Sequence, residues 1–330
     1  VVAAQPPETV GAIEVSYSQQ VAAINAIQLE GMGSNAWAFG AKATENGMGA
    51  LLANPHYPWY GTSRFWEKHL TIPDELDVYG ANLVGTAGVA VGFNKAVGWT
   101  HTVSDSKRVV LYQLSLNPED PTQYRYEGEW RSLEARDVSV NMQTDDGMQI
   151  KTTTVWFSHH GPVVEMPGLG WTASTAYAAR DANSDNIHVM SQWLAMGKAQ
   201  SMDEFIEAHK TYNAMPWVNT ISTSAEGRAV YLDNTNVGAL SPEAIKAWNA
   251  RIEKVPQLKQ MYLTKGLVIL DGSTRRDEWI SHPDALTTGT TPFAQRPLIE
   301  SEFYVFNAND SYWLSDPKPV SYTHLRAHET

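Results

Sequence analysis

The stretch Gly31-Met32-Gly33-Ser34-Asn35, followed by Ala36-Trp37-Ala38-Phe39, decides how this chain is interpreted. The apolar run predicts a buried strand, and the glycines before it predict a flexible loop. A serine in such a loop is most often structural. At this position, however, a cut between Gly33 and Ser34 would make Ser34 a chain terminus. Its own α-amino group, with a pKa of about 8, could then take the hydroxyl proton.

Ser34 would need such a base to act as a nucleophile, because the sequence around it suggests no other partner. The chain contains no G-x-S-x-G elbow and no recognisable histidine and aspartate partners for a serine. An N-terminal amine is one of the groups that activate a hydroxyl. Ser34 is therefore either a plain loop serine or, if the chain is cut before it, an N-terminal nucleophile.

Composition excludes several classes of function. The chain has 330 residues, a formal charge of −12 and no run of Lys or Arg, which argues against a nucleic-acid-binding surface. It has no Cys, which excludes thiol catalysis, thiolate metal sites and disulfides. No apolar stretch reaches the roughly 18 residues that a membrane span needs. Twelve Trp and fourteen Tyr are explained by a large core or by an apolar acyl or aryl pocket.

Glycine-containing turns predict a mostly antiparallel β architecture. Three strand pairs are expected: Trp37–Ala41 with Met48–Ala53 around Glu45-Asn46-Gly47, Val138–Met142 with Gln149–Ser158 around Asp145-Asp146-Gly147, and Thr220–Thr223 with Arg228–Leu232 around Glu226-Gly227. Such strands with peripheral helices indicate an α+β fold of layered sheets.

Two helices have clear start signals. Ser201 and Glu204 form a capping box ahead of the first helix. Ser241-Pro242-Glu243 opens the second helix, which is expected to run through Ile252. Val15–Leu29 is expected to be a short helical or extended piece.

Three further motifs are candidates for site residues. Prolines bracket His56 in Asn54-Pro55-His56-Tyr57-Pro58, so His56 is either a core imidazole bonded to a backbone carbonyl or a group that orients the nucleophile. Trp99–Val103 is a plain strand with an exposed His101, or a strand whose end offers a backbone N–H to an oxyanion. Asn307-Ala308-Asn309 predicts an Asx turn, although an Asn side chain is also a common oxyanion donor.

These pieces, in this order, resemble the penicillin acylase family of N-terminal-nucleophile hydrolases, and most closely its acylhomoserine lactone acylase and aculeacin acylase branch. The shared-looking motifs are GSNAWAFG, LLANPHYPW, HLTIPDELDVYGANLVG, VGFNKAVGWTHTVS, AARDAN, MPWVNT and NANDSYWL. The resemblance covers Gly33 to Pro317. It implies the four-layer αββα fold of these hydrolases.

The resemblance also implies roles for individual residues. Ser34 would be the nucleophile and the new N-terminus after cleavage at Gly33–Ser34, with His56 beside it. The backbone N–H of Val103 and the side chain of Asn309 would form the oxyanion hole. Tyr57 and Trp217 would line the acyl pocket. Some relatives bind calcium, but Asp105 does not meet the expected spacing of acidic residues, so no metal or other cofactor is expected.

The chain is expected to be a fragment of a larger enzyme. Residues 1–33 would be the end of an α-chain or spacer, residues 34–319 the front part of the β-chain, and residues 320–330 a non-native tail without core periodicity. The rest of the α-chain and an Arg expected beyond Asn309 would be missing, so this chain alone is expected to be inactive. The resemblance implies a heterodimer after processing and a periplasmic or secreted location.

The expected reaction is hydrolysis of an acyl amide of the homoserine lactone, lipopeptide or β-lactam type, releasing a fatty or aryl acid. Two alternatives remain open. Ser104-Asp105-Ser106-Lys107 and Ser184-Asp185-Asn186 match two parts of the serine β-lactamase signature, although K-T-G is absent and Arg108–Leu111 after the first part predicts a strand. The other alternative is a non-catalytic, aromatic-lined module that binds acyl groups.

Overall fold

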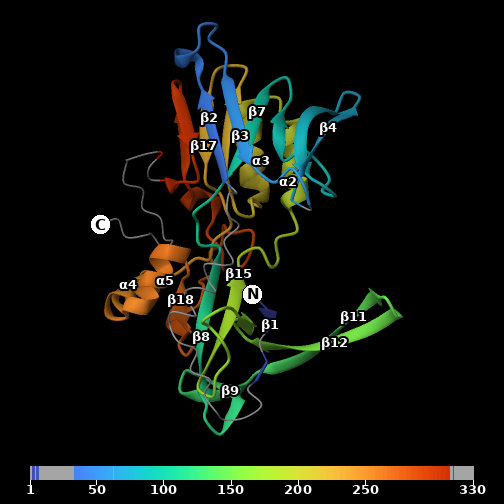
Figure 1. Cartoon of the computed structure of the whole chain (residues 1–330). Coiled ribbons are helices and arrows are strands. Elements are labelled where there is room, and N and C mark those ends of the chain that lie inside the picture. Colours follow the sequence, from blue (N-terminus) through green and yellow to red (C-terminus); the bar gives the residue numbers. More distant parts are fainter. Residues whose placement is uncertain (1, 4, 7–32, 62, 313–314, 316–330) are drawn as a thin grey trace.

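A computed structural model describes residues 2–3, 5–6, 33–61, 63–312 and 315. Figure 1 shows two bodies, one above the other, and a long two-stranded arm that projects from the lower body. The segment expected at Val15–Leu29 and the expected tail at residues 320–330 lie outside the described residues. Both bodies are built mainly from antiparallel sheet, which agrees with the predicted α+β class.

Two sheets lie face to face in the upper body. The larger sheet contains seven strands, in the order β19 (Leu298–Ser301), β17 (Ala229–Leu232), β16 (Val218–Ser224), β7 (Val97–Val103), β6 (Val91–Phe93), β5 (Leu76–Leu83) and β4 (Phe65–Ile72). The smaller sheet contains β20 (Tyr304–Asn307), β2 (Gly33–Phe39) and β3 (Ala50–His56). All of these neighbouring strands pair antiparallel.

The two sheets bury a small apolar core between them. Burial alternates along β2, so Ala36 and Ala38 are fully buried while the residues between them are partly exposed. The two alanines pack against Ile221 and Tyr231 of the larger sheet and Val305 of β20. Small side chains on β2 allow its backbone to lie close to the larger sheet, which positions the start of β2 over the end of β7.

The opposite face of the seven-stranded sheet is covered by helices α2 (Val189–Lys198) and α3 (Met202–Tyr212). Trp99 of β7 and Phe205 of α3 are fully buried at this contact, with ring centroids 5.7 Å apart. Ser201 caps α3 by accepting from the Glu204 amide at 3.1 Å, as predicted. The Glu204 carboxylate accepts from Gln200 at 2.7 Å rather than from Ser201, so the reciprocal half of the capping box is shifted by one residue.

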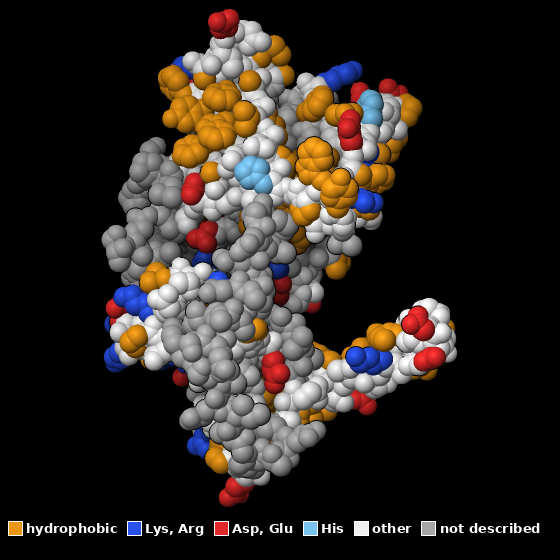
Figure 2. Space-filling view, in the orientation of Figure 1, with side chains coloured by type: hydrophobic (Ala, Val, Ile, Leu, Met, Phe, Trp, Pro, Cys, Tyr) orange, Lys and Arg blue, Asp and Glu red, His pale blue; other side chains and the backbone are white. Residues whose placement is uncertain are grey.

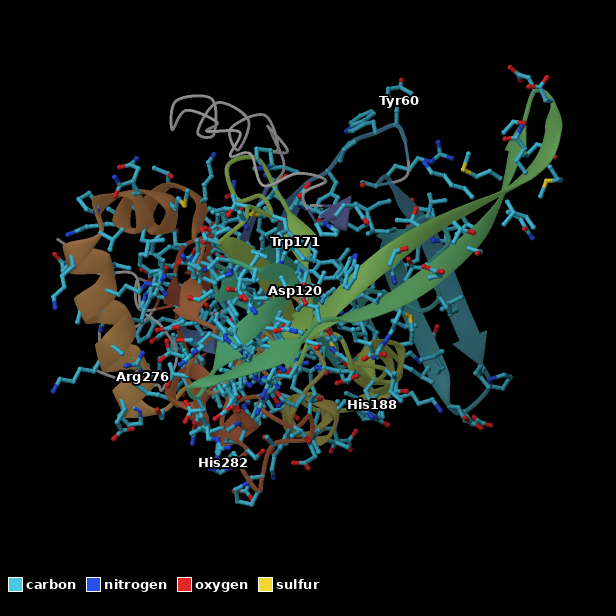
Figure 3. All side chains as sticks on the ribbon, turned by 90° about the horizontal axis from the view of Figure 1, so that it is seen from below. Tyr60, Asp120, Trp171, His188, Arg276 and His282 are labelled. Carbon is cyan, nitrogen blue, oxygen red and sulfur yellow. The ribbon has the colours of Figure 1, made fainter. Side chains whose placement is uncertain are left out.

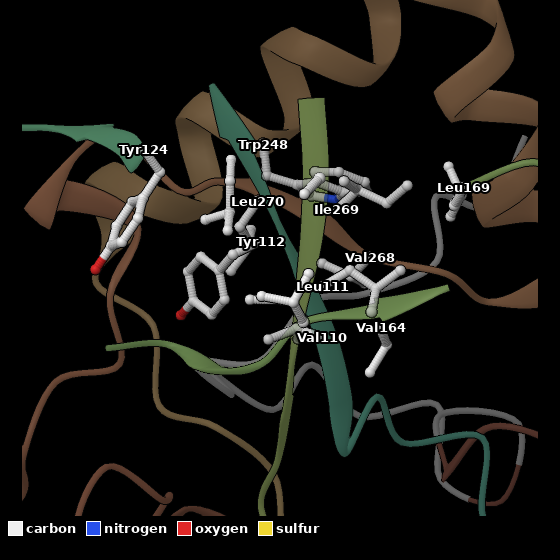
Figure 4. Close-up of a cluster of buried hydrophobic side chains, with 14 of the residues drawn as sticks. Val110, Leu111, Tyr112, Tyr124, Val164, Leu169, Trp248, Val268, Ile269 and Leu270 are labelled. Atoms are coloured by element: carbon white, nitrogen blue, oxygen red, sulfur yellow. The ribbon is translucent and has the colours of Figure 1, made fainter. Parts of the chain in front are cut away.

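The lower body contains a second sheet with its own core. Its strands are β10 (Glu129–Ser132), β9 (Asp120–Tyr126), β8 (Val109–Asn117), β15 (Thr175–Asp181) and β18 (Ile269–Asp271), of which β18 pairs with β8 in parallel. Helices α4 (Pro242–Lys254) and α5 (Pro256–Lys265) pack on this sheet. Figure 4 shows Trp248 of α4 among Leu111, Tyr112 and Ile269 in this core.

The projecting arm is the hairpin of β11 (Glu134–Thr144) and β12 (Gly147–Ser158), visible in Figures 1 and 3. At its base, β12 pairs with the short strand β13 (Gly161–Pro162). The remaining elements are short: β1 (Val2–Ala3) paired with β14 (Val164–Glu165), and the 3-10 turns η1 (Ala41–Ala43), η2 (Arg275–Asp277) and η3 (Phe293–Gln295).

The three predicted strand pairs are confirmed as β2–β3, β11–β12 and β16–β17. Gly47, Gly147 and Gly227 in their turns all have positive φ, which explains why glycine is used there. The second predicted helix is confirmed as α4, with Ser241 accepting from the Ala244 amide at 3.1 Å. Helices α2 and α5 were not predicted, because neither has a side-chain N-cap.

Candidate active site

Ser34 occupies the second position of β2 and is almost fully buried, with 3% of its surface exposed. The chain is continuous from Gly33 to Ser34, so the structure describes the uncut form. The Ser34 hydroxyl donates to the Gly33 carbonyl oxygen over 2.5 Å, which places Oγ beside the carbonyl group that precedes it. The first predicted site residue therefore lies in an enclosed position, next to the peptide bond expected to be cut.

Asn309 lies directly beside Ser34, as the resemblance implied. Its side-chain oxygen accepts from the Ser34 backbone amide at 2.7 Å, and its Nδ2 donates to the Val103 carbonyl at 3.1 Å. One side chain thus connects the start of β2 to the end of β7. Asn309 has a φ of 70°, in the left-handed region that few residues other than glycine adopt.

Val103 ends β7, and its own amide and carbonyl point away from β16. The Ser104 amide donates to the Trp217 carbonyl at 3.0 Å, which makes Val103 and Val218 a non-hydrogen-bonded pair. Among the residues that the structure describes, β7 pairs with β6 only near its start. The Val103 N–H consequently lies on the same side as its carbonyl, which Asn309 contacts.

His56 ends β3 and lies opposite Gly33 in the antiparallel register. A Cβ atom built on Gly33 would lie 3.8 Å from His56 Nδ1, so the imidazole is adjacent to the bond expected to be cut. His56 Nε2 lies 3.5 Å from Asn35 Nδ2. The alternative of a core imidazole is wrong, because His56 is exposed at the rim of the smaller sheet.

Gly33 is required by a close approach. A Cβ at this position would lie 2.9 Å from Asn309 Oδ1, which is closer than a methyl group and an oxygen can pack. The absence of a side chain therefore lets Asn309 reach the Ser34 amide.

A pocket beside Ser34 contains the two predicted acyl-pocket residues. Its cavity of about 60 Å³ is lined by Ser34, Pro55, Tyr57, Phe65, Asn82, Leu83, Ala90, Val91, His101, Thr102, Val103, Trp193, Trp217 and Val218. Burial raises the pKa of Tyr57, while a hydrogen bond with the Trp217 side chain acts in the opposite direction. The pocket thus joins the hydroxyl of Ser34 to a mostly apolar wall. His56 and Asn309 are not part of this lining.

The sequence interpretation missed how His101 and Trp193 contribute to this pocket. His101 is buried rather than exposed, since 7% of its surface is accessible. Its Nε2 accepts from the Trp193 indole N–H at 3.1 Å, so Nδ1 carries the proton and donates to the Asn219 carbonyl at 3.1 Å. Burial lowers the pKa of His101 to about 4, so the ring is neutral. The sequence of β7 could not reveal that His101 is buried, because β7 is covered on both faces and its residues do not alternate between buried and exposed.

The rival S-x-x-K motif does not form a nucleophile and base pair. Ser104 donates to Asp233 at 2.9 Å, whereas Lys107 Nζ pairs with Asp105 at 2.6 Å. The four residues lie between β7 and β8 and not at the start of a helix. The serine and the lysine are therefore bonded to different carboxylates.

A group that could hold a metal ion lies in the lower body, away from Ser34. Ligand atoms of His159, His160 and Glu278 lie within 4.8 Å of one another. However, Tyr124 and the Gly272 carbonyl already contact the two imidazoles at 2.7 Å and 3.0 Å. The positive charge of nearby Arg side chains also contributes to the lowered pKa values of both histidines, after burial, the main cause. We regard the group as a structural hydrogen-bond network.

Within the described part of the chain, no helix is long and apolar enough to cross a membrane. This finding concerns helices alone.

Comparison with known proteins gives a consistent family match. A family model described as penicillin amidase matches residues 3–329. Acyl-homoserine lactone acylase PvdQ of Pseudomonas fluorescens is 39% identical over 287 residues, covering 86% of this chain and 36% of that protein. Aculeacin-A acylase of Actinoplanes utahensis is 38% identical over 325 residues, covering 96% of this chain and 40% of that protein. The chain thus spans less than half the length of these curated relatives.

A solved structure shares the fold. Thermostable penicillin G acylase from Alcaligenes faecalis matches with a TM-score of 0.65 and 19% sequence identity, covering 89% of this chain and 47% of that chain. At this level of identity the match concerns the fold alone. It agrees with the mostly antiparallel α+β architecture of the two bodies described above.

Proposed function

The chain belongs to the penicillin amidase family, and from that premise we propose that the whole protein is an acyl amide hydrolase with Ser34 as its N-terminal nucleophile. The observation that carries this proposal is the position of Asn309, whose side chain contacts both the Ser34 amide and the Val103 carbonyl. A nucleophile and two candidate oxyanion donors thereby meet beside one pocket, which Ser34 and Val103 line and Asn309 does not. An aromatic-lined binding module would not need this arrangement.

The first chemical step is self-cleavage of the precursor. Ser34 Oγ attacks the Gly33 carbonyl carbon, the C–N bond breaks, and the nitrogen of Ser34 becomes a free amine while an ester forms. Water then hydrolyses the ester and frees the Ser34 hydroxyl. The 2.5 Å hydrogen bond from Ser34 Oγ to the Gly33 oxygen supports this step, because it holds the hydroxyl beside the carbonyl group that it would attack.

Amide hydrolysis then follows through an acyl-enzyme. The free α-amine takes the proton from Ser34 Oγ as the oxygen attacks the substrate carbonyl, and it passes that proton to the departing amine. Water attacks the ester and gives a proton to the α-amine, which passes it to Ser34 Oγ as the C–Oγ bond breaks and the carboxylic acid leaves. Asn309 Oδ1, which accepts from the Ser34 nitrogen in the uncut chain, would hold that amine in place. His56 would orient the amine from the rim.

The oxyanion of each tetrahedral intermediate would receive hydrogen bonds from the Val103 N–H and Asn309 Nδ2. Loss of one such donor typically lowers kcat by about 100-fold to 1,000-fold. The acyl group would occupy the apolar pocket between Tyr57 and Trp217. Self-cleavage and amide hydrolysis would thus use the same two hydrogen-bond donors.

The rest of the protein would complete the site and the fold. The outward face of the smaller sheet carries a stacked Trp37–Phe306 pair, with Leu52 and Tyr304 about half exposed beside it. Figure 2 shows hydrophobic side chains gathered over this end of the molecule. A further helical layer, supplied by parts of the full-length protein outside this chain, would cover this face and give the four-layer αββα arrangement. The division into residues 1–33, 34–319 and 320–330 is part of the same proposal.

The substrate is proposed to be a fatty acyl amide of homoserine lactone or of a lipopeptide, since the chain shares 38–39% identity with relatives named acyl-homoserine lactone acylase and aculeacin-A acylase. A β-lactam amide is the weaker candidate, because the penicillin G acylase match is one of fold alone. A heterodimer after processing, a role in quorum quenching and a periplasmic or secreted location belong to the same proposal.

The test uses the full-length precursor purified from cells. Two bands under denaturing conditions, together with release of homoserine lactone from its dodecanoyl amide, are the expected result. A single uncut band with acyl-group binding but no turnover would favour the binding module. Labelling of Ser104 rather than Ser34 by a β-lactam probe would favour the S-x-x-K alternative.

A further inference from the structure

A buried cluster of polar side chains lies directly beneath the proposed oxyanion donors. It comprises Thr102, Asn219, Tyr231 and Asn307, each with at most 1% of its surface exposed. Buried polar groups are costly unless they are hydrogen-bonded, so a cluster of this size needs a purpose or a complete set of partners. Here each of the four side chains is hydrogen-bonded, and the bonds converge on Asn307, which in turn accepts from the Asn309 amide.

Asn307 is the centre of this cluster. Its side-chain oxygen accepts from the Asn309 backbone amide at 2.8 Å, from the Thr102 hydroxyl at 2.6 Å and from Asn219 Nδ2 at 3.2 Å. Its Nδ2 donates to the Asp310 carbonyl at 2.9 Å. The Asn307 side chain is thus hydrogen-bonded to the backbone before and after the Asn309 side chain, which carries the proposed donor.

The bond from the Asn309 amide to Asn307 Oδ1 forms an Asx turn, in which a side chain accepts from the amide two residues ahead. Asn309 needs this support because its φ of 70° is unfavourable for a residue with a Cβ atom. Without the turn, the backbone would relax toward negative φ. The Asn309 side chain would then rotate away from Ser34 and Val103.

Asn219 connects the same centre to the other proposed donor. Its Nδ2 lies 3.0 Å from Thr102 Oγ1 and 3.3 Å from the Val103 carbonyl. Tyr231 donates to its side-chain oxygen at 2.9 Å, which fixes the orientation of the amide. The end of β7 and the turn after β20 are therefore held in register by a single network.

From these contacts, and resting on the proposed function, we infer that Asn307 is a positioning residue of the oxyanion hole. It touches neither substrate nor Ser34. It acts by holding Asn309 in the left-handed conformation that directs Nδ2 and Oδ1 toward the reacting groups. Hydrogen bonds from Asn219 and Thr102 fix the orientation of the Asn307 side chain.

The experiment compares Asn307→Ala with Asn307→Ser in the full-length precursor. The two side chains are of similar size and leave similar cavities, but a serine hydroxyl still accepts from an amide two residues ahead. Asn307→Ala is expected to lower both kcat and the rate of self-cleavage by about 30-fold or more, with KM within about threefold, since a donor is misplaced. Asn307→Ser is expected to have a kcat and a self-cleavage rate that are each at least about fivefold higher than those of Asn307→Ala.

Asn94→Ala is the matched control, because Asn94 also makes four side-chain hydrogen bonds but holds a turn before β7. It is expected to lower Tm by an amount similar to Asn307→Ala while kcat stays within about twofold. Equal rates for Asn307→Ala and Asn307→Ser, or wild-type rates in Asn307→Ala, would overturn the inference. If the unsubstituted precursor neither cuts itself nor hydrolyses the amide, the proposed function itself fails. If Asn309→Ala is inactive while Asn307→Ala is active, only the positioning role fails.

Discussion

The side-chain oxygen of Asn309 accepts a 2.7 Å hydrogen bond from the backbone amide of Ser34, although 275 positions separate the two residues. The pairing of β20 with β2 brings them together, because Ala36 lies opposite Asn307 in that ladder. A contact formed through sheet register is rigid. It prepares the nitrogen of Ser34 to remain in place when the bond to Gly33 is cut.

Asn309→Ala in the full-length precursor is expected to slow both self-cleavage and acyl amide turnover, by roughly 100-fold or more in kcat, because one oxyanion donor is removed. Single-turnover kinetics and the fraction of cut protein over time measure the two effects. Asn186→Ala is the control, since Asn186 donates to the Ala214 carbonyl away from the site. Normal self-cleavage with impaired turnover would show that the two steps do not share this donor.

Gly33→Ala is expected to slow self-cleavage by about tenfold, because the added Cβ would lie 2.9 Å from Asn309 Oδ1 and must displace it. The molecules that are cut should then turn over substrate at the normal rate, since residue 33 is no longer bonded to Ser34. Gly170→Ala is the control, because a Cβ there meets no atom within 4 Å. Unchanged cleavage in Gly33→Ala would contradict the packing argument.

The full-length enzyme is expected to prefer a dodecanoyl over a phenylacetyl amide. Similarity to an acyl-homoserine lactone acylase favours the longer chain, and a pocket that the rest of the full-length protein extends beyond Tyr57, Trp193 and Trp217 would gain roughly 0.8 kcal/mol for each further methylene buried. The ratio of kcat/KM for the two amides measures the preference. A clear preference for phenylacetyl would contradict assignment of the substrate to the long-chain class.

The stability of the protein is expected to fall as the pH drops from about 6.5 toward 4. Burial lowers the pKa of His101 to about 4 and that of His209 to about 3, so the unfolded chain binds protons in this range while the folded chain does not. Because one pKa unit corresponds to about 1.4 kcal/mol, His101 contributes roughly 3 kcal/mol and His209 roughly 5 kcal/mol of stability that is present above pH 6.5 and lost on acidification. Urea unfolding at pH 7 and pH 5 measures the loss.

His209→Asn should flatten this pH dependence, because it removes one of the three imidazoles buried in the described residues, the other two being those of His101 and His160. His188→Asn is the control, since Figure 3 shows His188 at the surface and its side chain is exposed. An identical slope in the wild type and His209→Asn would mean that His209 is not neutral in the folded chain.

The sequence allowed the strands around Ser34, Gly147 and Gly227 to be predicted, because turn glycines and apolar runs are local signals. The site residues were predicted by resemblance to a family, and the structure brings Ser34, Val103 and Asn309 together. The burial of His101 and the network around Asn307 could not be predicted in this way. They depend on which strands lie opposite one another, and that is set by the packing of two sheets rather than by any single segment.

Mass analysis of the larger chain of the purified full-length protein tests the central claim most directly. We predict that this chain begins with Ser34-Asn35-Ala36-Trp37, that Ser34→Ala leaves an uncut and inactive precursor, and that Ser104→Ala is cut normally. A mature protein that runs uncut through Gly33, or a Ser34→Ala variant that retains both cleavage and turnover, would contradict it.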